Sequence, residues 1–203
     1  MKKLIFIILV VFSTYLYADS PLTSSEFYLS YSDFPQVMNA HDREDKTLTD
    51  NDIQFLTDKT VMLDAKLALI NALGFKQAGK HNEAKYLNRI NPNIKSYDEV
   101  SGILTSAEEA IIFAYLLAMD DYFNVARALD IAKNASNKAP QSLAIALILG
   151  LIQAQIELDN DWCQVYKVVN HVRELPNLEQ DIKPDAVKQI FENYLDDYKQ
   201  FCN

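Results

Sequence analysis

The feature that most limits the fold of this chain is a helical apolar period that begins near Thr49. In its first stretch, apolar residues or threonine recur at every third or fourth position: Ile53, Leu56, Thr60, Leu63, Leu67 and Ile70. This spacing gives a helix one buried stripe. The chain has no clear strand pattern after residue 49, so the sequence predicts an all-α domain over residues 49–203.

Prolines and short polar turns divide this domain into helices. The run Ser106-Ala107-Glu108-Glu109 has the S-x-x-E form of a capping box, which begins a helix. Pro140 suits the first position of a helix, whereas Pro92 and Pro176 follow predicted helix ends. We predict helices over residues 107–119, 122–135, 140–158, 162–175 and 184–203.

Two of the four glycines lie close together, at Gly74 and Gly79. Gly79 separates two apolar runs, so we predict that it ends the helix that begins near residue 49, in the left-handed conformation. Gly74 is expected inside that helix. Glycine costs about 1 kcal/mol relative to alanine there, which the close approach of another helix could offset.

Three segments share one plan of helix, turn, helix and proline, with 48 and then 36 residues between Pro92, Pro140 and Pro176. The segment AGKHNEAKYL at 78–87 resembles the turn of a tetratricopeptide repeat, with Gly79 and Ala84 at the usual small positions. A later segment, ARALDIAKNASNKAP at 126–140, is similar to the second half of such a repeat. The small residues that carry this similarity are Ala128, Ala132 and Ala135.

In the third segment, Gly150 resembles the glycine of the family's Leu-Gly pair, and Trp162 resembles the aromatic residue of its turn. The resemblance covers residues 61–176 and implies a stack of antiparallel helix hairpins, a TPR-like α-solenoid, with these residues packed between helices. The pattern is incomplete, because Leu116 stands where a small residue belongs. An unrelated bundle of helices is the alternative.

The C-terminal helix is expected to cap the stack, because the end of a helical array needs a cover. It has an apolar stripe at helical spacing, formed by Val187, Ile190, Tyr194, Tyr198 and Phe201. We expect this stripe in the core; the alternative is a docking face.

The two cysteines, Cys163 and Cys202, lie in the last fifth of the chain. In an oxidising compartment they would form one disulfide, closing a loop worth about 4 kcal/mol on the chain-entropy model. The alternative is a pair of buried thiols.

Residues 1–18 have the order of a secretory signal peptide, with Lys2 and Lys3 ahead of an apolar run and Ala18 at the expected cleavage site. The run is shorter than the roughly 20 residues that cross a bilayer. We therefore expect a periplasmic or secreted protein without membrane contact after cleavage. An uncleaved anchor is the alternative.

Residues 19–48 differ from the rest of the chain. Pro21 and Pro35 interrupt any long helix, while the segment still holds four aromatic residues over 27–34. We predict an irregular or partly helical aromatic arm packed on the main body, followed by an acidic, solvated linker with the sequence HDREDK at 41–46.

The composition argues against several kinds of site. The net charge is −9, and it becomes −11 once the two lysines of residues 1–18 are removed, so nucleic acid is not an expected partner. The glycines are too scattered for a phosphate-binding loop. His41, His81 and His171 share no metal-ligand spacing, so we expect no metal, cofactor or catalytic residue.

The leading hypothesis is therefore an exported, non-enzymatic scaffold that binds a protein or peptide. In this hypothesis the aromatic arm lies in the concave groove of its own helix stack and competes with the partner. A second hypothesis is a small disulfide-stapled inhibitor or immunity protein against a secreted toxin or hydrolase. A third is an enzyme, which would require polar groups that converge with a histidine in a pocket.

Overall fold

The computed structural model describes residues 20–94, 100 and 104–202. The predicted signal peptide at 1–18 and part of the connector that includes Gly102 lie outside the described residues. Within the described ranges, none of the helices has the length and apolar character that crossing a bilayer requires.

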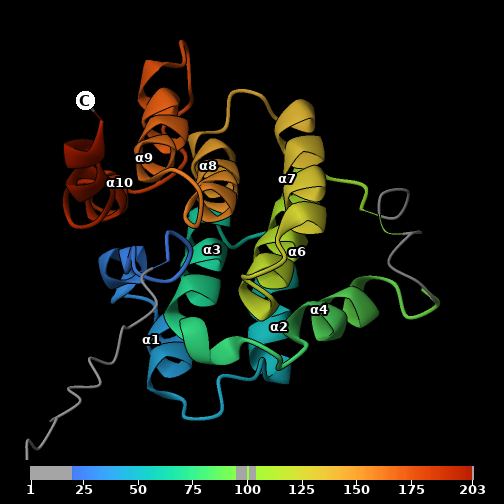
Figure 1. Ribbon diagram of the computed structural model, residues 1–203. Coiled ribbons are helices and arrows are strands. Elements are labelled where there is room, and N and C mark those ends of the chain that lie inside the picture. Colours follow the sequence, from blue (N-terminus) through green and yellow to red (C-terminus); the bar gives the residue numbers. More distant parts are fainter. Residues whose placement is uncertain (1–19, 95–99, 101–103, 203) are drawn as a thin grey trace, which may run out of the picture.

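The described chain is helical, which confirms the all-α prediction (Figure 1). An isolated bridge pairs Ser142 with Glu179, and no strand occurs within the described ranges. The α-helices are α1 (Pro35–Asp42), α2 (Asp50–Thr57), α3 (Leu63–Leu73), α4 (Asn82–Ile90), α6 (Ala107–Asp120), α7 (Ala126–Lys138), α8 (Leu143–Glu157), α9 (Trp162–Asn170) and α10 (Pro184–Glu192). Short 3-10 helices are η1 (Phe27–Tyr31), η2 (Phe75–Gln77), η4 (His171–Glu174) and η5 (Leu195–Phe201).

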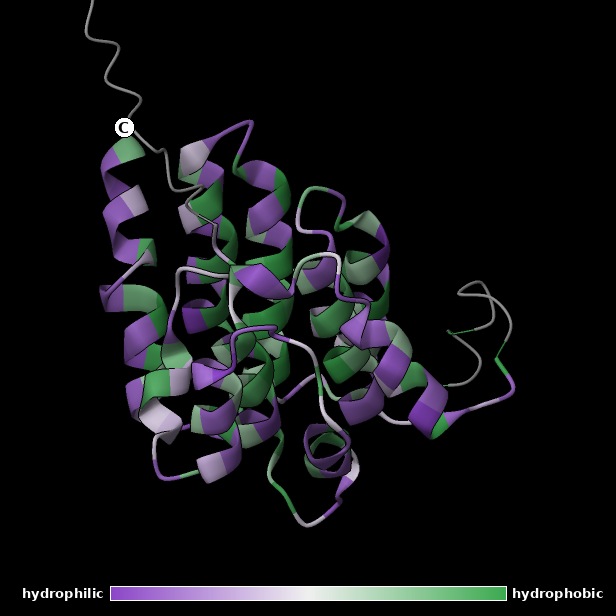
Figure 2. Cartoon of the chain, turned by 90° about the horizontal axis from the view of Figure 1, so that it is seen from below, coloured by the Kyte–Doolittle hydropathy of each residue, from purple (hydrophilic) through white to green (hydrophobic). Residues whose placement is uncertain are grey.

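The centre of the molecule is formed by α3, α6 and α8, which are buried on nearly every side. In α3, every residue from Asp64 to Leu73 is buried. Helix α6 contacts α3 and α8, and it also contacts the more amphipathic helices α4 and α7. Helix α9 packs against α8 in the same way. Figure 2 shows the resulting apolar interior between helices whose outer faces are hydrophilic.

The buried polar side chains of α3 connect it to its neighbours. The Tyr31 hydroxyl donates to Asp64 Oδ2 at 2.7 Å, and Asn71 Nδ2 donates to the Tyr115 hydroxyl at 3.1 Å. The Lys66 ammonium is fully buried and forms an ion pair with Glu108 of α6. Buried polar groups are tolerated only when they are paired in this way. These contacts therefore fix the register of α3 against both η1 and α6.

The N-terminal arm packs against α3 and α10 and is part of the core. Phe27, Tyr28 and Tyr31 of η1 are buried. The Lys183 backbone N–H donates to the Tyr31 hydroxyl at 3.2 Å, and Lys183 Nζ lies 2.8 Å from Asp33 Oδ1. A partner that displaced the arm would expose these buried rings to water. The structure therefore gives no support to the hypothesis that the arm and a partner compete for one groove.

The segment 41–46 is mostly exposed to solvent, at His41, Asp42, Glu44 and Asp45, and its first two residues end α1. Arg43 Nη1 lies 2.6 Å from Asp52 Oδ2 of α2, and Lys46 Nζ donates to the Ala40 carbonyl at 3.3 Å. These two cations tie the exposed segment to α2 and to the last turn of α1.

Three predicted helix boundaries are wrong. The helix expected from residue 49 is interrupted between α2 and α3, where Asp58 Oδ1 accepts hydrogen bonds from the backbone and side chain of Thr60. Gly74 ends α3 with φ +65° instead of lying inside it, and Gly79 has the expected positive φ, +70°, after η2. The last helix ends at Glu192, and the chain continues as η5.

Burial of tyrosine hydroxyls makes the fold sensitive to alkali. Burial raises the pKa of Tyr86 and of Tyr115 above the ordinary value of 10.0, and the acidic groups of Glu109 and Glu108 raise that of Tyr86 further. A group whose pKa is raised on folding stabilises the protein below its unfolded pKa, and that stability is lost as the pH rises beyond it.

We therefore expect the free energy of unfolding to fall above about pH 10. Replacing Tyr86 with Phe should reduce the steepness of this loss by up to about 1.4 kcal/mol per pH unit. Urea unfolding at several pH values between about 8 and 11 measures how the free energy of unfolding changes with pH. Identical slopes for the wild type and Tyr86→Phe would contradict the assignment.

Candidate functional site

The connections within the helix pairs α3–α4, α6–α7 and α8–α9 lie at the same end of their first helices (Figure 1). Lys138 Nζ of α7 donates to the Leu104 carbonyl just before α6 at 2.6 Å, so α7 ends where α6 begins. Helix α8 begins a few residues after α7 ends, so it starts at the end where α6 also starts, opposite the three connections. The backbone N–H of Gly79 donates to the Asp120 carbonyl at 2.9 Å, which joins the first two connections. We call residues 74–81, 120–125 and 158–162 the turn edge.

Each of the three turns exposes an aromatic ring. The exposed fractions are 51% for Phe75, 80% for Phe123 and 51% for Trp162. Of the seven large apolar side chains that are exposed in the described part of the chain, these three lie on the turn edge and Phe201 packs against Trp162. Exposed aromatic rings are candidates for contact with a partner.

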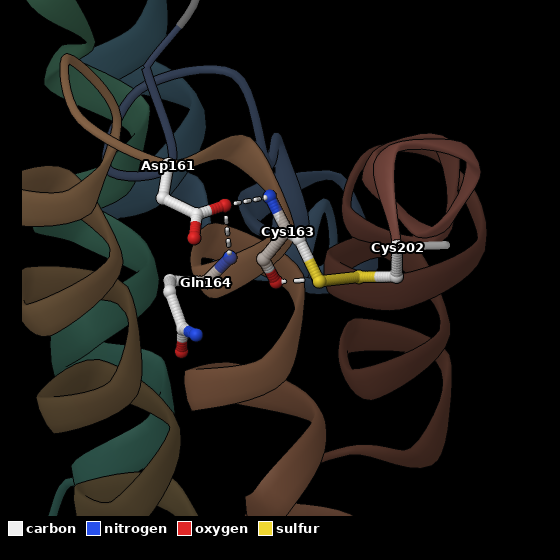
Figure 3. Close-up of a disulfide and its surroundings, with 4 residues drawn as sticks. All are labelled: Asp161, Cys163, Gln164 and Cys202. Atoms are coloured by element: carbon white, nitrogen blue, oxygen red, sulfur yellow. Dashed lines mark hydrogen bonds between the residues drawn. A yellow bond between two sulfur atoms is a disulfide. The ribbon is translucent and has the colours of Figure 1, made fainter.

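Exposed acidic residues are close in sequence to two of these rings. Asp121 lies two residues before Phe123, and Asp159 and Asp161 precede Trp162. Asp161 also caps α9, because its Oδ1 accepts from the backbone N–H groups of Cys163 at 2.9 Å and Gln164 at 3.3 Å (Figure 3). The α3–α4 turn differs, since Lys76 and Lys80 are exposed there.

The predicted disulfide between Cys163 and Cys202 is confirmed (Figure 3). It joins the start of α9 to the residue after η5, with the two Cα atoms 4.8 Å apart. The Trp162 ring lies edge-on to Phe201, with centroids 4.7 Å apart, and 6.4 Å from Tyr198. The disulfide thus holds the C-terminal segment against the aromatic end of the turn edge.

The small residues expected between helices lie in several environments. Ala128, Ala132 and Ala135 are all buried on α7, whereas Ala84 is only partly buried on α4. A Cβ atom built on Gly150 of α8 would lie 3.5 Å from the Val169 Cα of α9, so these helices approach closely there. Gly79, in contrast, serves a turn and faces open space.

Two aromatic expectations need correction. We expected Trp162 to pack between paired helices, but it is half exposed and contacts η5 instead, because it begins α9 at the outer end of the turn. The C-terminal stripe is not uniformly buried either. Ile190, Tyr194 and Tyr198 are buried, whereas Phe201 is 43% exposed.

The three histidines have different surroundings. His41 stacks on Tyr28 with ring centroids 4.8 Å apart, and His171 Nδ1 lies 3.5 Å from one carboxylate, that of Glu174. His81 lies near two carboxylates, Glu83 and Asp120. Sequence spacing could not reveal this group, because Asp120 is 39 residues from His81.

Two hollows on the surface lie away from these histidines. One, of about 680 Å³, is lined by residues of α1, α2 and the segments that flank them, including the paired Arg43 and Asp52. Another, of about 530 Å³, lies between α2 and α4 and includes Lys85 and Arg89. No histidine lines either hollow, so neither brings a histidine together with converging polar groups.

No protein-family model matches the chain, and neither a curated protein nor a solved structure matches it. Any functional interpretation must therefore come from the side chains themselves.

Removal of the disulfide should destabilise the fold without changing its helical content. The loop closed by the bond spans a sequence separation of 39. Replacing both Cys163 and Cys202 with Ser should lower the free energy of unfolding by about 3–4 kcal/mol. Urea unfolding of the oxidised wild type and of this variant tests the expectation. Equal stabilities would mean that the bond does not restrain the C-terminal segment.

The close contact at Gly150 predicts opposite results for two substitutions. Gly150→Ala adds only an ordinary van der Waals contact to Val169 and should raise stability by up to about 1 kcal/mol through helix propensity. Gly150→Leu should lower it by about 1–3 kcal/mol, because the larger side chain must displace α9. Thermal unfolding measures both variants. A leucine variant as stable as the alanine variant would refute the close packing of α8 and α9.

Proposed function

We propose that this chain is an exported, non-enzymatic helical-repeat protein that binds a protein or peptide partner through the turn edge. The observation that carries the proposal is the exposure of an aromatic ring on each of three turns, up to 80% at Phe123. Aromatic residues are enriched in protein interfaces, where burying one ring contributes much of the binding energy.

The contacts between helices support the repeat arrangement that this function requires. The helices of the pairs α6–α7 and α8–α9 pack against each other, and α6 also touches α3 and α8. In the first unit, α3 packs against α1, and α4 packs against α6 and α2. We infer TPR-like stacking from this order and from the sequence resemblance, with η5 and α10 as the C-terminal cap. Repeats of this kind present equivalent positions of successive units along one surface.

Export is the second part of the proposal. It is supported by the order of residues 1–18 and by the disulfide, since such bonds persist in oxidising compartments. The surrounding medium would then be the periplasm or the cell exterior.

The charge of the turn edge specifies the partner further. Exposed aspartates are close in sequence to Phe123 and Trp162, whereas Lys76 and Lys80 are exposed in the α3–α4 turn, and the whole chain has a net charge of −9. Complementary charge selects partners and speeds association, while the apolar rings supply affinity. The expected ligand is a segment that combines aromatic or aliphatic residues with Lys or Arg.

A displayed library of random peptides tests this function directly. The folded protein should enrich peptides that pair apolar with basic residues, and the double variant Phe123→Ala and Trp162→Ala should weaken their binding by at least about tenfold, or about 1.4 kcal/mol. Phe123 is exposed, so its loss should change stability by less than about 0.5 kcal/mol.

Met62→Ala is the matched control, because Met62 is 59% exposed but precedes α3 at the end away from the turn edge. It should leave peptide binding unchanged. An enrichment that survives the double variant, or that disappears with Met62→Ala, would exclude the turn edge as the binding surface. Failure to enrich any peptide would count against the function itself.

A further inference from the structure

A mixed group of one imidazole and two carboxylates lies where the α3–α4 turn meets the end of α6. His81 Nδ1 is 3.4 Å from Asp120 Oδ2 and 3.6 Å from Glu83 Oε1. One ligand atom from each residue can be chosen so that all three lie within 4.8 Å of one another. The side chains converge from two different helix pairs, which are otherwise joined at this point by backbone contacts.

The spacing fits a small divalent cation. An ion with bonds of about 2.0–2.1 Å in tetrahedral geometry keeps its ligand atoms about 3.4 Å apart. Both His81 distances are close to that value, and the ligand atoms of the two carboxylates lie within 4.8 Å of each other.

Backbone N–H groups hold Asp120 in place. The His81 backbone N–H donates to Asp120 Oδ1 at 2.7 Å, which leaves Oδ2 directed at the His81 ring. The Gly79 N–H donates to the Asp120 carbonyl at 2.9 Å. A ligand set whose orientation is fixed in advance loses less entropy on binding an ion than a mobile one does.

The two carboxylates are much less exposed than the imidazole. The Glu83 side chain is 3% exposed and that of Asp120 is 11% exposed, whereas that of His81 is 74% exposed. The exposed imidazole leaves the group open to solvent on one side.

We propose that His81, Glu83 and Asp120 bind one Zn²⁺ ion, which ties the α3–α4 turn to the end of α6. One imidazole nitrogen with two carboxylate oxygens is a borderline donor set that suits Zn²⁺. Ca²⁺ requires six to eight oxygens, and Mg²⁺ prefers oxygen alone. Three protein ligands leave a fourth position for water. His81 and Asp120 lie on the turn edge, but the Zn²⁺ site does not require a bound peptide.

Zn²⁺ titration of the purified protein against a chromogenic chelator tests the proposal. The wild type should bind one equivalent of Zn²⁺. His81→Asn should weaken Zn²⁺ binding by at least about tenfold, because even the loss of a residue that only supports a metal ligand has an effect of this size. Asparagine is the appropriate replacement because His81 has φ +55°, which Asn tolerates well. Asp120→Asn should give a similar loss. His171→Asn is the control, since His171 lies beside one carboxylate only, and it should leave binding unchanged.

A thermal shift provides the second measurement, because an ion that binds only the folded state raises the unfolding temperature. Zn²⁺ should raise that of the wild type and of His171→Asn, but not that of His81→Asn. The proposal is overturned if the wild type binds no Zn²⁺ at about 100 μM. It is also overturned if His81→Asn binds as tightly as the wild type, or if the His171 variant alone loses binding.

Discussion

The burial of three almost wholly apolar helices is the constraint on which the rest of the structure depends. A helix that is apolar on all sides needs neighbours on all sides. Helix α6 obtains them from α3, α4, α7 and α8. Helices α3 and α8 each contact α6 and would each leave another face exposed. The N-terminal arm covers α3, and α9 with η4 covers α8, so the irregular ends of the chain complete the core.

Polar contacts decide how these covering segments are fixed. Tyr31 links the arm to α3 through Asp64 and to the segment before α10 through the backbone of Lys183. The Cys163–Cys202 disulfide performs the equivalent task at the other side, where η5 meets α9. Ordering a short covering segment costs conformational entropy, which specific bonds help to offset together with the burial of its rings. The bonds of Tyr31 and the disulfide use no residue of the turn edge, which exposes Phe75, Phe123 and Trp162.

The sequence predicted those features that depend on local or compositional signals. The capping box at Ser106 is present, with the Glu109 N–H donating to Ser106 Oγ at 3.0 Å, and the disulfide follows from having two cysteines. The break between α2 and α3 was missed, because the Asp58–Thr60 turn interrupts an apolar period that continues on both sides. The exposure of Trp162 and the meeting of His81 with Asp120 depend on how helix pairs pack, which periodicity does not encode.

The central claim is that α6 is enclosed by its neighbours, and that α3 and α8 in turn need the N-terminal arm and α9 to cover them. Native-state hydrogen exchange tests this claim most directly. Amides of α6 and of the adjoining faces of α3 and α8 should exchange last and at similar rates, through global unfolding. Those of α4 and α7, which have exposed outer faces, should exchange earlier. If α6 exchanged as fast as α4, or if α3 opened independently while α6 and α8 stayed protected, a single core built around α6 would be contradicted.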